Sequence, residues 1–177
     1  MTQKRPQTDE YAPFYRSYIA RVPEGDLLLT LESGHEGWQR LLGALTEAQA
    51  DYRYEPSKWS VKEVVGHVVD TERIFAYRLL RIARGDQTPL SGFEQDDYVR
   101  EGNFSARSLA ELLAEFGAVR RATTILIRSL PDKAWIRRGS ANQKEVTVTA
   151  LAFIIAGHEL HHRAIVEQRY LPSLGTP

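Results

Sequence analysis

The sequence predicts an all-α fold, a four-helix bundle with an N-terminal segment packed on it. Apolar residues recur at intervals of three or four in four long segments, and glycine- and proline-containing stretches separate these segments. Four such helices joined by loops fit one bundle. A length of 177 residues suits a single domain that covers residues 1–177.

Residues 1–24 form the predicted N-terminal arm. The arm is rich in aromatic residues, which are scarce in disordered tails, so we expect it to lie against the bundle: Tyr11, Phe14, Tyr15 and Tyr18. Its first ten residues lack an apolar core and do not resemble a secretory signal.

The first two predicted helices cover about 26–49 and 61–84. Leucines and Trp38 recur at helical spacing in the first, although Gly34 and Gly37 weaken the pattern in its middle. The second has a clear start, because Ser60 and Glu63 have the spacing of a capping box. We expect it to end at Gly85.

The last two predicted helices cover about 106–130 and 147–170. A loop over 86–104 precedes the third helix, which ends before Pro131. A connector over 131–145, with a turn at 138–140, leads to the fourth helix, which ends before Pro172.

The composition excludes several functions. Twenty-three basic residues balance 23 acidic ones, so neither a nucleic acid nor an anionic membrane is an expected partner. The longest run without a polar side chain, residues 150–157, is too short to span a bilayer. The chain has no cysteine, which leaves His, Asp and Glu as its strong metal ligands. We expect a cytoplasmic protein.

Three histidines form a predicted metal site. His158 and His162 are four residues apart in the fourth helix and therefore lie on one face of it. Both fall on its apolar stripe, and His67 falls on the apolar stripe of the second helix. Three neutral imidazoles with an open fourth position are typical of a catalytic Zn²⁺ or similar site.

Two alternatives stay open at this point. Each histidine alone could be a hydrogen-bonded structural residue, with His161 as a spare or supporting residue beside the pair and His35 exposed. His158, Glu159 and His162 also match the zincin pattern, in which the glutamate is a general base and a third ligand lies downstream. The residues after His162 include no histidine, which argues against a zincin.

Other side chains near the predicted site are candidates for catalysis or binding. Asp70, one turn after His67, could orient an imidazole by accepting its second N–H. Glu159 could act as a base, but it points about 100° away from His158 around the helix and is better explained as a surface residue in a salt bridge. Candidates for contact with an anionic substrate or cofactor, unless they serve ordinary packing, are Arg73, Tyr77 and Arg78.

Four motifs in order resemble those of one family. They are Glu-Tyr-Ala-Pro-Phe-Tyr at 10–15; Trp-Ser-Val-Lys-Glu-Val-Val-Gly-His at 59–67; Arg-Gly-Asp at 84–86 with Pro-Leu-x-Gly-Phe-x-Gln-Asp at 89–96; and Ala-Gly-His-x-x-x-His at 156–162. The chain resembles the DinB/YfiT-like superfamily of metal-binding four-helix bundles, in its YfiT-type branch.

The resemblance implies that His67, His158 and His162 bind one divalent metal ion, zinc or nickel, and that the protein is a homodimer. The family includes enzymes that transfer low-molecular-weight thiols and relatives described as metal-dependent hydrolases. We therefore expect a metal-dependent transferase that joins a small thiol to an electrophilic small molecule. A metal-dependent hydrolase and a metal-binding protein without turnover are the alternatives.

Overall fold

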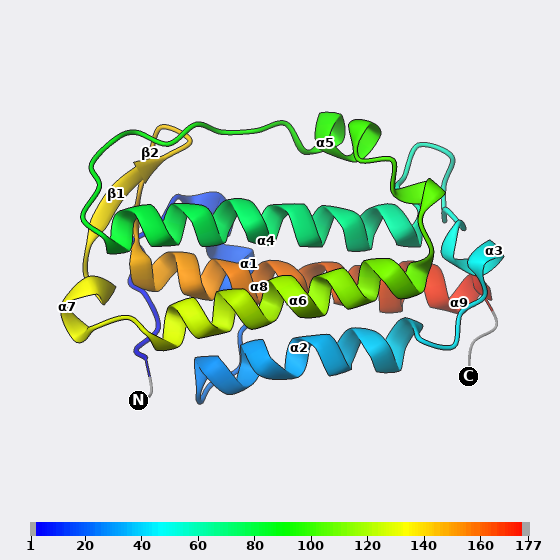
Figure 1. Ribbon diagram of the computed structural model, residues 1–177, viewed down its shortest axis with the longest axis horizontal. Coiled ribbons are helices and arrows are strands. Elements are labelled where there is room, and N and C mark those ends of the chain that lie inside the picture. The colour runs from blue at the N-terminus through cyan, green and yellow to red at the C-terminus, as the bar shows by residue number, and fades with distance from the viewer. Residues whose placement is uncertain (1–2, 175–177) are drawn as a thin grey trace.

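Four long helices form the body of the protein in the computed structural model, which describes residues 3–174 (Figure 1). They are α2 (Leu27–Leu42), α4 (Val61–Ala83), α6 (Leu109–Arg128) and α8 (Val148–Ile165). α2 and α4 each pack against both α6 and α8. The predicted four-helix bundle is therefore confirmed. None of the described helices combines the length and the apolar character needed to cross a bilayer.

The connection between α4 and α6 determines the topology. These two helices run in the same direction, so the chain from residue 84 to residue 108 returns along the outside of the bundle (Figure 1). The sequence predicted a loop here, but the crossover contains helix α5 (Gln95–Glu101), which contacts α4. Two acidic residues in its first turn, Asp96 and Asp97, favour a helix at this place.

Several predicted helix boundaries need correction. The first helix stops at Leu42, because a capping box between Thr46 and Gln49 starts a separate helix, α3 (Glu47–Ala50). The ammonium of Lys62 on α4 lies 2.8 Å from the carboxylate of Glu47 and 3.0 Å from that of Asp51, which anchors α3.

Capping also explains the starts of the long helices. The capping box predicted at Ser60 and Glu63 is present, and a second one at Ser108 and Glu111 starts α6 later than expected. A 3₁₀ turn (Phe104–Ala106) occupies the expected start of that helix. At the other end of the chain, a π-helical turn (Val166–Tyr170) and α9 (Leu171–Leu174) extend α8.

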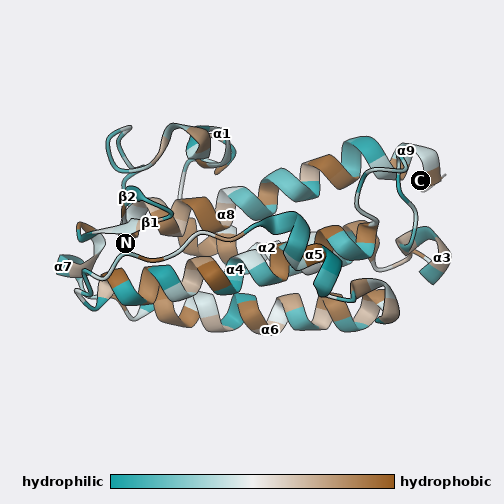
Figure 2. Cartoon of the chain, turned by 90° about the horizontal axis from the view of Figure 1, so that it is seen from above, coloured by the Kyte–Doolittle hydropathy of each residue, from teal (hydrophilic) through white to brown (hydrophobic). Residues whose placement is uncertain are grey.

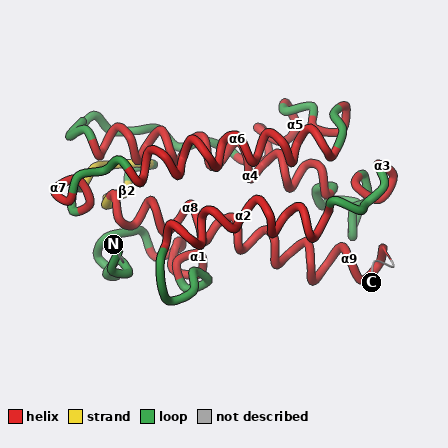
Figure 3. Tube along the Cα trace, turned by 60° about the horizontal axis from the view of Figure 1, so that its bottom comes forward, coloured by secondary structure: helices red, strands yellow, loops and turns green. Residues whose placement is uncertain are grey.

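A β-hairpin is the one sheet in the described chain and was not predicted. After α7 (Asp132–Trp135), strand β1 (Arg138–Ala141) pairs antiparallel with β2 (Lys144–Thr147), so that Gly139 faces Val146. Asn142 and Gln143 both have positive φ, as a tight two-residue hairpin turn requires. Gln is an unusual residue for that conformation, which is why the sequence signal is weak. α7 and the hairpin lie at one end of the bundle, and α3 and the end of the described chain lie at the other (Figure 3).

The core consists of two apolar clusters with a polar layer between them. One cluster takes residues 27–31 of α2, 75–83 of α4 and 148–156 of α8, and the other takes residues 38–42, 61–69 and 166–170. The layer between them holds buried charged and histidine side chains. Its contribution from α8 corresponds to the hydrophilic turns in the second half of that helix (Figure 2).

Arg120 of α6 links all four long helices in this polar layer. Its guanidinium donates to both carboxylate oxygens of Glu72 on α4, at 2.7–3.1 Å, and to the carbonyl of Leu31 on α2 at 2.9 Å. The carboxylate of Glu159 on α8 lies 4.0 Å away. A Cβ at Gly34 would lie 2.4 Å from Arg120, so this glycine makes room for the ion pair.

The N-terminal arm packs on α8, as predicted. It forms a 3₁₀ turn (Pro13–Tyr15) and helix α1 (Arg16–Ile19). The guanidinium of Arg5 joins the start of the arm to its end by donating to the carbonyls of Ile19 and Val22 at 2.5 and 2.6 Å. The carbonyl of Tyr18 approaches Gly157 so closely that a Cβ there would lie 2.1 Å from the oxygen.

Candidate metal centre

Three buried imidazoles meet in the polar layer. His67 comes from α4, and His158 and His162 come from successive turns of α8. The Nε2 atoms of His67 and His158 are 3.1 Å apart, and one ring nitrogen from each of the three histidines lies within 4.8 Å of the others. The structure thus brings together the three residues that the sequence singled out.

The arrangement fits a divalent metal ion. Zinc binds imidazole nitrogens at about 2.0–2.1 Å in tetrahedral geometry, which places ligand nitrogens about 3.3 Å apart. The observed 3.1–4.8 Å spacing brackets that value. Burial lowers the pKa of His67 from 6.5 to about 4 and holds the pKa values of His158 and His162 well below their usual range. At neutral pH all three are uncharged, the form that binds metal.

Thr71 is a supporting residue that the sequence analysis missed. Its hydroxyl lies 3.4 Å from Nδ1 of His67, the nitrogen on the other side of the ring from Nε2. A partner at Nδ1 fixes the orientation of the ring and leaves the Nε2 lone pair for a metal. The signal that could have revealed it is its position, four residues after His67 on the same face of the helix.

Asp70, the residue expected to orient an imidazole, makes a different contact. Its carboxylate is half-buried and lies 3.4 Å from the guanidinium of Arg73, which also contacts Glu115 at 2.6 Å. No hydrogen bond joins Asp70 to His67 in residues 3–174. Asp70 belongs to an ion-pair cluster on the outside of α4 and α6.

Glu159 is not the surface residue that the sequence favoured. Only 1% of it is exposed, and its carboxylate lies 3.4 Å from Arg163 and 4.0 Å from Arg120. The reason is that α8 is covered on this side by α2, where Gly34 and Gly37 leave space for these charged groups. Burial raises the pKa of Glu159. Its contacts place it with the arginines of the polar layer.

The three candidates for ligand contact on α4 occupy different surroundings. Arg73 is exposed, and Tyr77 is exposed and accepts a hydrogen bond from Arg81. Arg78 is buried and lines the same cavity as His67. Of the three, Arg78 is the one placed at the histidine site.

The remaining histidines lie outside the group of three. His161 is half-buried and packs against Tyr18, with ring centroids 5.0 Å apart. His35, expected to be exposed, is half-buried between Gly117 and Gln39. Among the described residues, the cluster of potential ligands consists of His67, His158 and His162.

Two cavities reach the histidines from different sides. One, of about 310 Å³, is lined by His67 and His158 together with aromatic residues of the N-terminal arm. The other, of about 340 Å³, is lined by His162 together with Trp59 and Tyr170. Gln95, at the start of α5, lines both cavities. The crossover therefore forms part of the wall on each side of the site.

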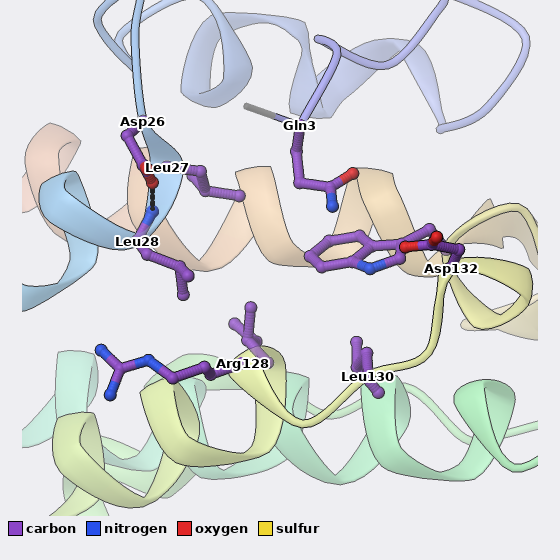
Figure 4. Close-up of a pocket in the computed structure, with 9 residues that line it drawn as sticks. Gln3, Asp26, Leu27, Leu28, Arg128, Leu130 and Asp132 are labelled. Atoms are coloured by element: carbon purple, nitrogen blue, oxygen red, sulfur yellow. Dashed lines mark hydrogen bonds between the residues drawn. The ribbon is translucent and has the colours of Figure 1, made fainter. Parts of the chain in front are cut away.

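A smaller cavity of about 90 Å³ lies at the start of α2, away from the histidines (Figure 4). Asp26 on its wall accepts a hydrogen bond from the backbone N–H of Leu28 at 2.8 Å and caps α2. This carboxylate therefore has a structural partner, and the cavity contains no histidine.

The fold and the three histidines define a class of protein, a helical bundle with a candidate metal centre between two of its helices. The chain belongs to the DinB superfamily, whose family model matches residues 30–166. No curated protein matches the sequence.

Several solved structures share the fold, and two of them are compared with this chain below. YfiT from Bacillus subtilis, described as a probable metal-dependent hydrolase with an unusual four-helix bundle topology, matches with a TM-score of 0.77 and 17% identity, over 99% of this chain and 95% of that one. A mycothiol-dependent maleylpyruvate isomerase matches with a TM-score of 0.65 and 14% identity, over 82% of this chain and 61% of that one.

Proposed function

We propose that this protein is a metal-dependent enzyme that transfers a low-molecular-weight thiol to a small electrophilic substrate. In this proposal His67, His158 and His162 hold one divalent ion, zinc or nickel. The observation that carries the proposal is the pair of cavities that reach the histidines from different sides and share Gln95. A transfer between two molecules needs room for both of them beside the same centre.

The surrounding residues suit this chemistry. A divalent ion at the three nitrogens would supply positive charge that favours the thiolate form of a nearby thiol, which is the nucleophile in thiol transfer. Thr71 keeps the ring of His67 in place. Trp59 and Tyr18 cover two of the rings, with centroids 4.7 Å from His67 and 5.4 Å from His158, and all three imidazoles are buried. Burial strengthens electrostatic interactions at the site.

The comparisons are consistent with this class of activity but give two precedents. One neighbour in fold is described as mycothiol-dependent, the other as a metal-dependent hydrolase. Hydrolysis of a small molecule is therefore the second candidate, and it needs the same histidines but only one organic substrate. A divalent ion can bring the pKa of water close to 7, which suffices for hydrolysis.

The first experiment is elemental analysis of the purified protein and of three variants, His67→Ala, His158→Ala and His162→Ala. We expect about one zinc or nickel ion per chain in the wild type and a large loss in each variant. His35→Ala is the matched control and should keep the metal. Equal metal content in all five proteins would contradict the three-histidine site.

The second experiment separates the reactions. The metal-loaded protein is incubated with a panel of electrophiles, with and without small thiols, and the consumption of both is followed. Thiol-dependent loss of an electrophile supports the transferase, and thiol-independent loss supports the hydrolase. Metal binding without either reaction, across the panel, would contradict the proposal and favour a metal-binding protein without turnover.

A further inference from the structure

Arg78 is a buried cation without a carboxylate partner. Three basic side chains are buried in residues 3–174: Lys62, Arg78 and Arg120. Lys62 lies within 3.0 Å of two carboxylates, and Arg120 binds Glu72 through two nitrogens. Arg78 is only 3% exposed, yet no carboxylate of the described chain lies within ion-pair distance of it.

The surroundings of Arg78 satisfy it only in part. Its Nη2 donates to the carbonyl of Ser91 at 2.6 Å, and its guanidinium lies 5.6 and 5.9 Å from the ring centroids of Phe75 and Phe93. The phenol oxygen of Tyr15 is a further hydrogen-bond partner of the guanidinium. Aromatic rings and neutral oxygens stabilise a cation, but they leave its net charge uncompensated.

The position of Arg78 connects this charge with the metal centre. Arg78 lines the 310 Å³ cavity to which His67 and His158 also contribute. A guanidinium is planar and presents paired N–H donors that match the two oxygens of a carboxylate. Buried charges are normally paired with an opposite charge. The one acidic side chain that lines this cavity, Glu94, is exposed and forms no ion pair with Arg78, so the position beside the guanidinium is open to an anionic ligand.

We propose that Arg78 anchors the carboxylate group of a small organic acid in this cavity. The body of the acid lies against the rings of Tyr15, Phe75 and Phe93, beside the histidine centre. The claim that this acid is the electrophilic substrate rests on the proposed function. The binding of the anion itself needs only Arg78 and the cavity. The apolar walls, and Glu94 at the same cavity, favour a monoanion with an apolar body over inorganic phosphate.

Binding of benzoate and of benzamide, measured by calorimetry at pH 7.5, tests the proposal. These probes have similar shape, but only benzoate is charged. We expect benzoate to bind the wild-type protein with an affinity at least about tenfold higher than that of benzamide, and to bind Arg78→Met at least about tenfold more weakly. Arg78→Lys, which keeps the charge without the paired donors, should fall between them. Arg73→Met is the matched control on the same helix and should bind benzoate like the wild type.

Metal-free and metal-loaded protein are both used, so that the two proposals can fail separately. Arg78-dependent benzoate binding in a protein that never takes up metal would overturn the proposed function and leave the carboxylate site standing. Equal binding of benzoate and benzamide, unchanged binding by Arg78→Met, or tighter binding of inorganic phosphate than of benzoate would overturn the site. If Arg78→Met does not fold, benzoate binding by Arg78→Lys equal to that of the wild type would overturn the proposed paired contact.

Discussion

The hydroxyl of Thr71 lies 3.4 Å from Nδ1 of His67, while Nε2 of the same ring faces His158 at 3.1 Å. The two nitrogens of the ring therefore have different surroundings. Nδ1 faces Thr71 of the same helix, and Nε2 faces the candidate metal position. With the hydroxyl of Thr71 beside Nδ1, Nε2 is the nitrogen of His67 that faces the other two histidines and is placed to bind an ion.

We predict that Thr71→Val weakens metal binding by about tenfold, because the valine keeps the shape of the side chain but cannot accept the N–H of His67. Competition with a chromophoric chelator measures the affinity. Thr71→Ser, which retains the hydroxyl, should restore most of it. A valine variant that binds metal as tightly as the serine variant would show that the contact has no role in metal binding.

The stability of the metal-free protein should fall when the pH is lowered from 7 to 5. The pKa of His67 is about 4 in the folded protein and 6.5 in the unfolded chain. Between these pH values, His67 is protonated in the unfolded chain but stays neutral in the folded protein, which favours unfolding. By pH 5 this difference costs about 2 kcal/mol for His67 alone. His158 and His162 change stability in the same direction.

Urea denaturation at pH 7, 6 and 5 measures this effect. His67→Gln should show a shallower loss of stability, since glutamine does not titrate. A bound metal ion should raise the stability at pH 7 and lose its effect as protons compete for the imidazoles. The same pH dependence in His67→Gln and the wild type would argue against the low pKa of His67.

Gly157→Ala should detach the N-terminal arm from α8, because the new methyl group would meet the carbonyl of Tyr18. We expect a loss of about 2 kcal/mol in the free energy of unfolding. Limited trypsin digestion should then cleave after Arg16 and Arg21 before it cleaves the bundle. Cleavage throughout the chain at equal rates would mean that the glycine supports the whole fold and has no special relation to the arm.

Arg120→Met should destabilise the protein by about 3–5 kcal/mol, because it leaves the carboxylate of Glu72 buried without its counter-ion. The double variant Arg120→Met with Glu72→Gln should recover part of the loss. Urea denaturation of the two single variants and the double variant gives the coupling energy. Arg100→Met, in an exposed ion pair, is the control and should have little effect. Additive losses would show that Glu72 and Arg120 do not act as a pair.

The long helices could be predicted because their signals are local. Ser60 and Glu63 are three residues apart and mark the start of α4, and the apolar spacing identifies its buried face. The three histidines could be found for the same reason, since His158 and His162 share a helical face and His67 lies on an apolar stripe. Such features need no knowledge of how the helices pack.

Features that depend on tertiary packing could not be predicted in this way. Gly34 and Gly37 looked like weak points in a helix, but their missing side chains make room for Arg120 and Arg163 of other helices. Glu159 points away from the histidines, as helix geometry requires, and is nevertheless buried because α2 covers that side. The contacts of Arg78 with Ser91 and Phe93 depend on the path of the crossover, which the sequence does not specify.

The three histidines are unevenly distributed along the chain. His158 and His162 are neighbours on one helix, whereas His67 precedes His158 by 91 residues. A chain that lacks α8 retains a single ligand, and an isolated α8 retains two. We therefore expect tight metal uptake only after α4 and α8 have packed together. Before that, binding to all three histidines would also have to overcome the entropy cost of closing the long loop between the two helices. Metal content would then serve as a readout of completed folding, both during synthesis and in fragments of the protein.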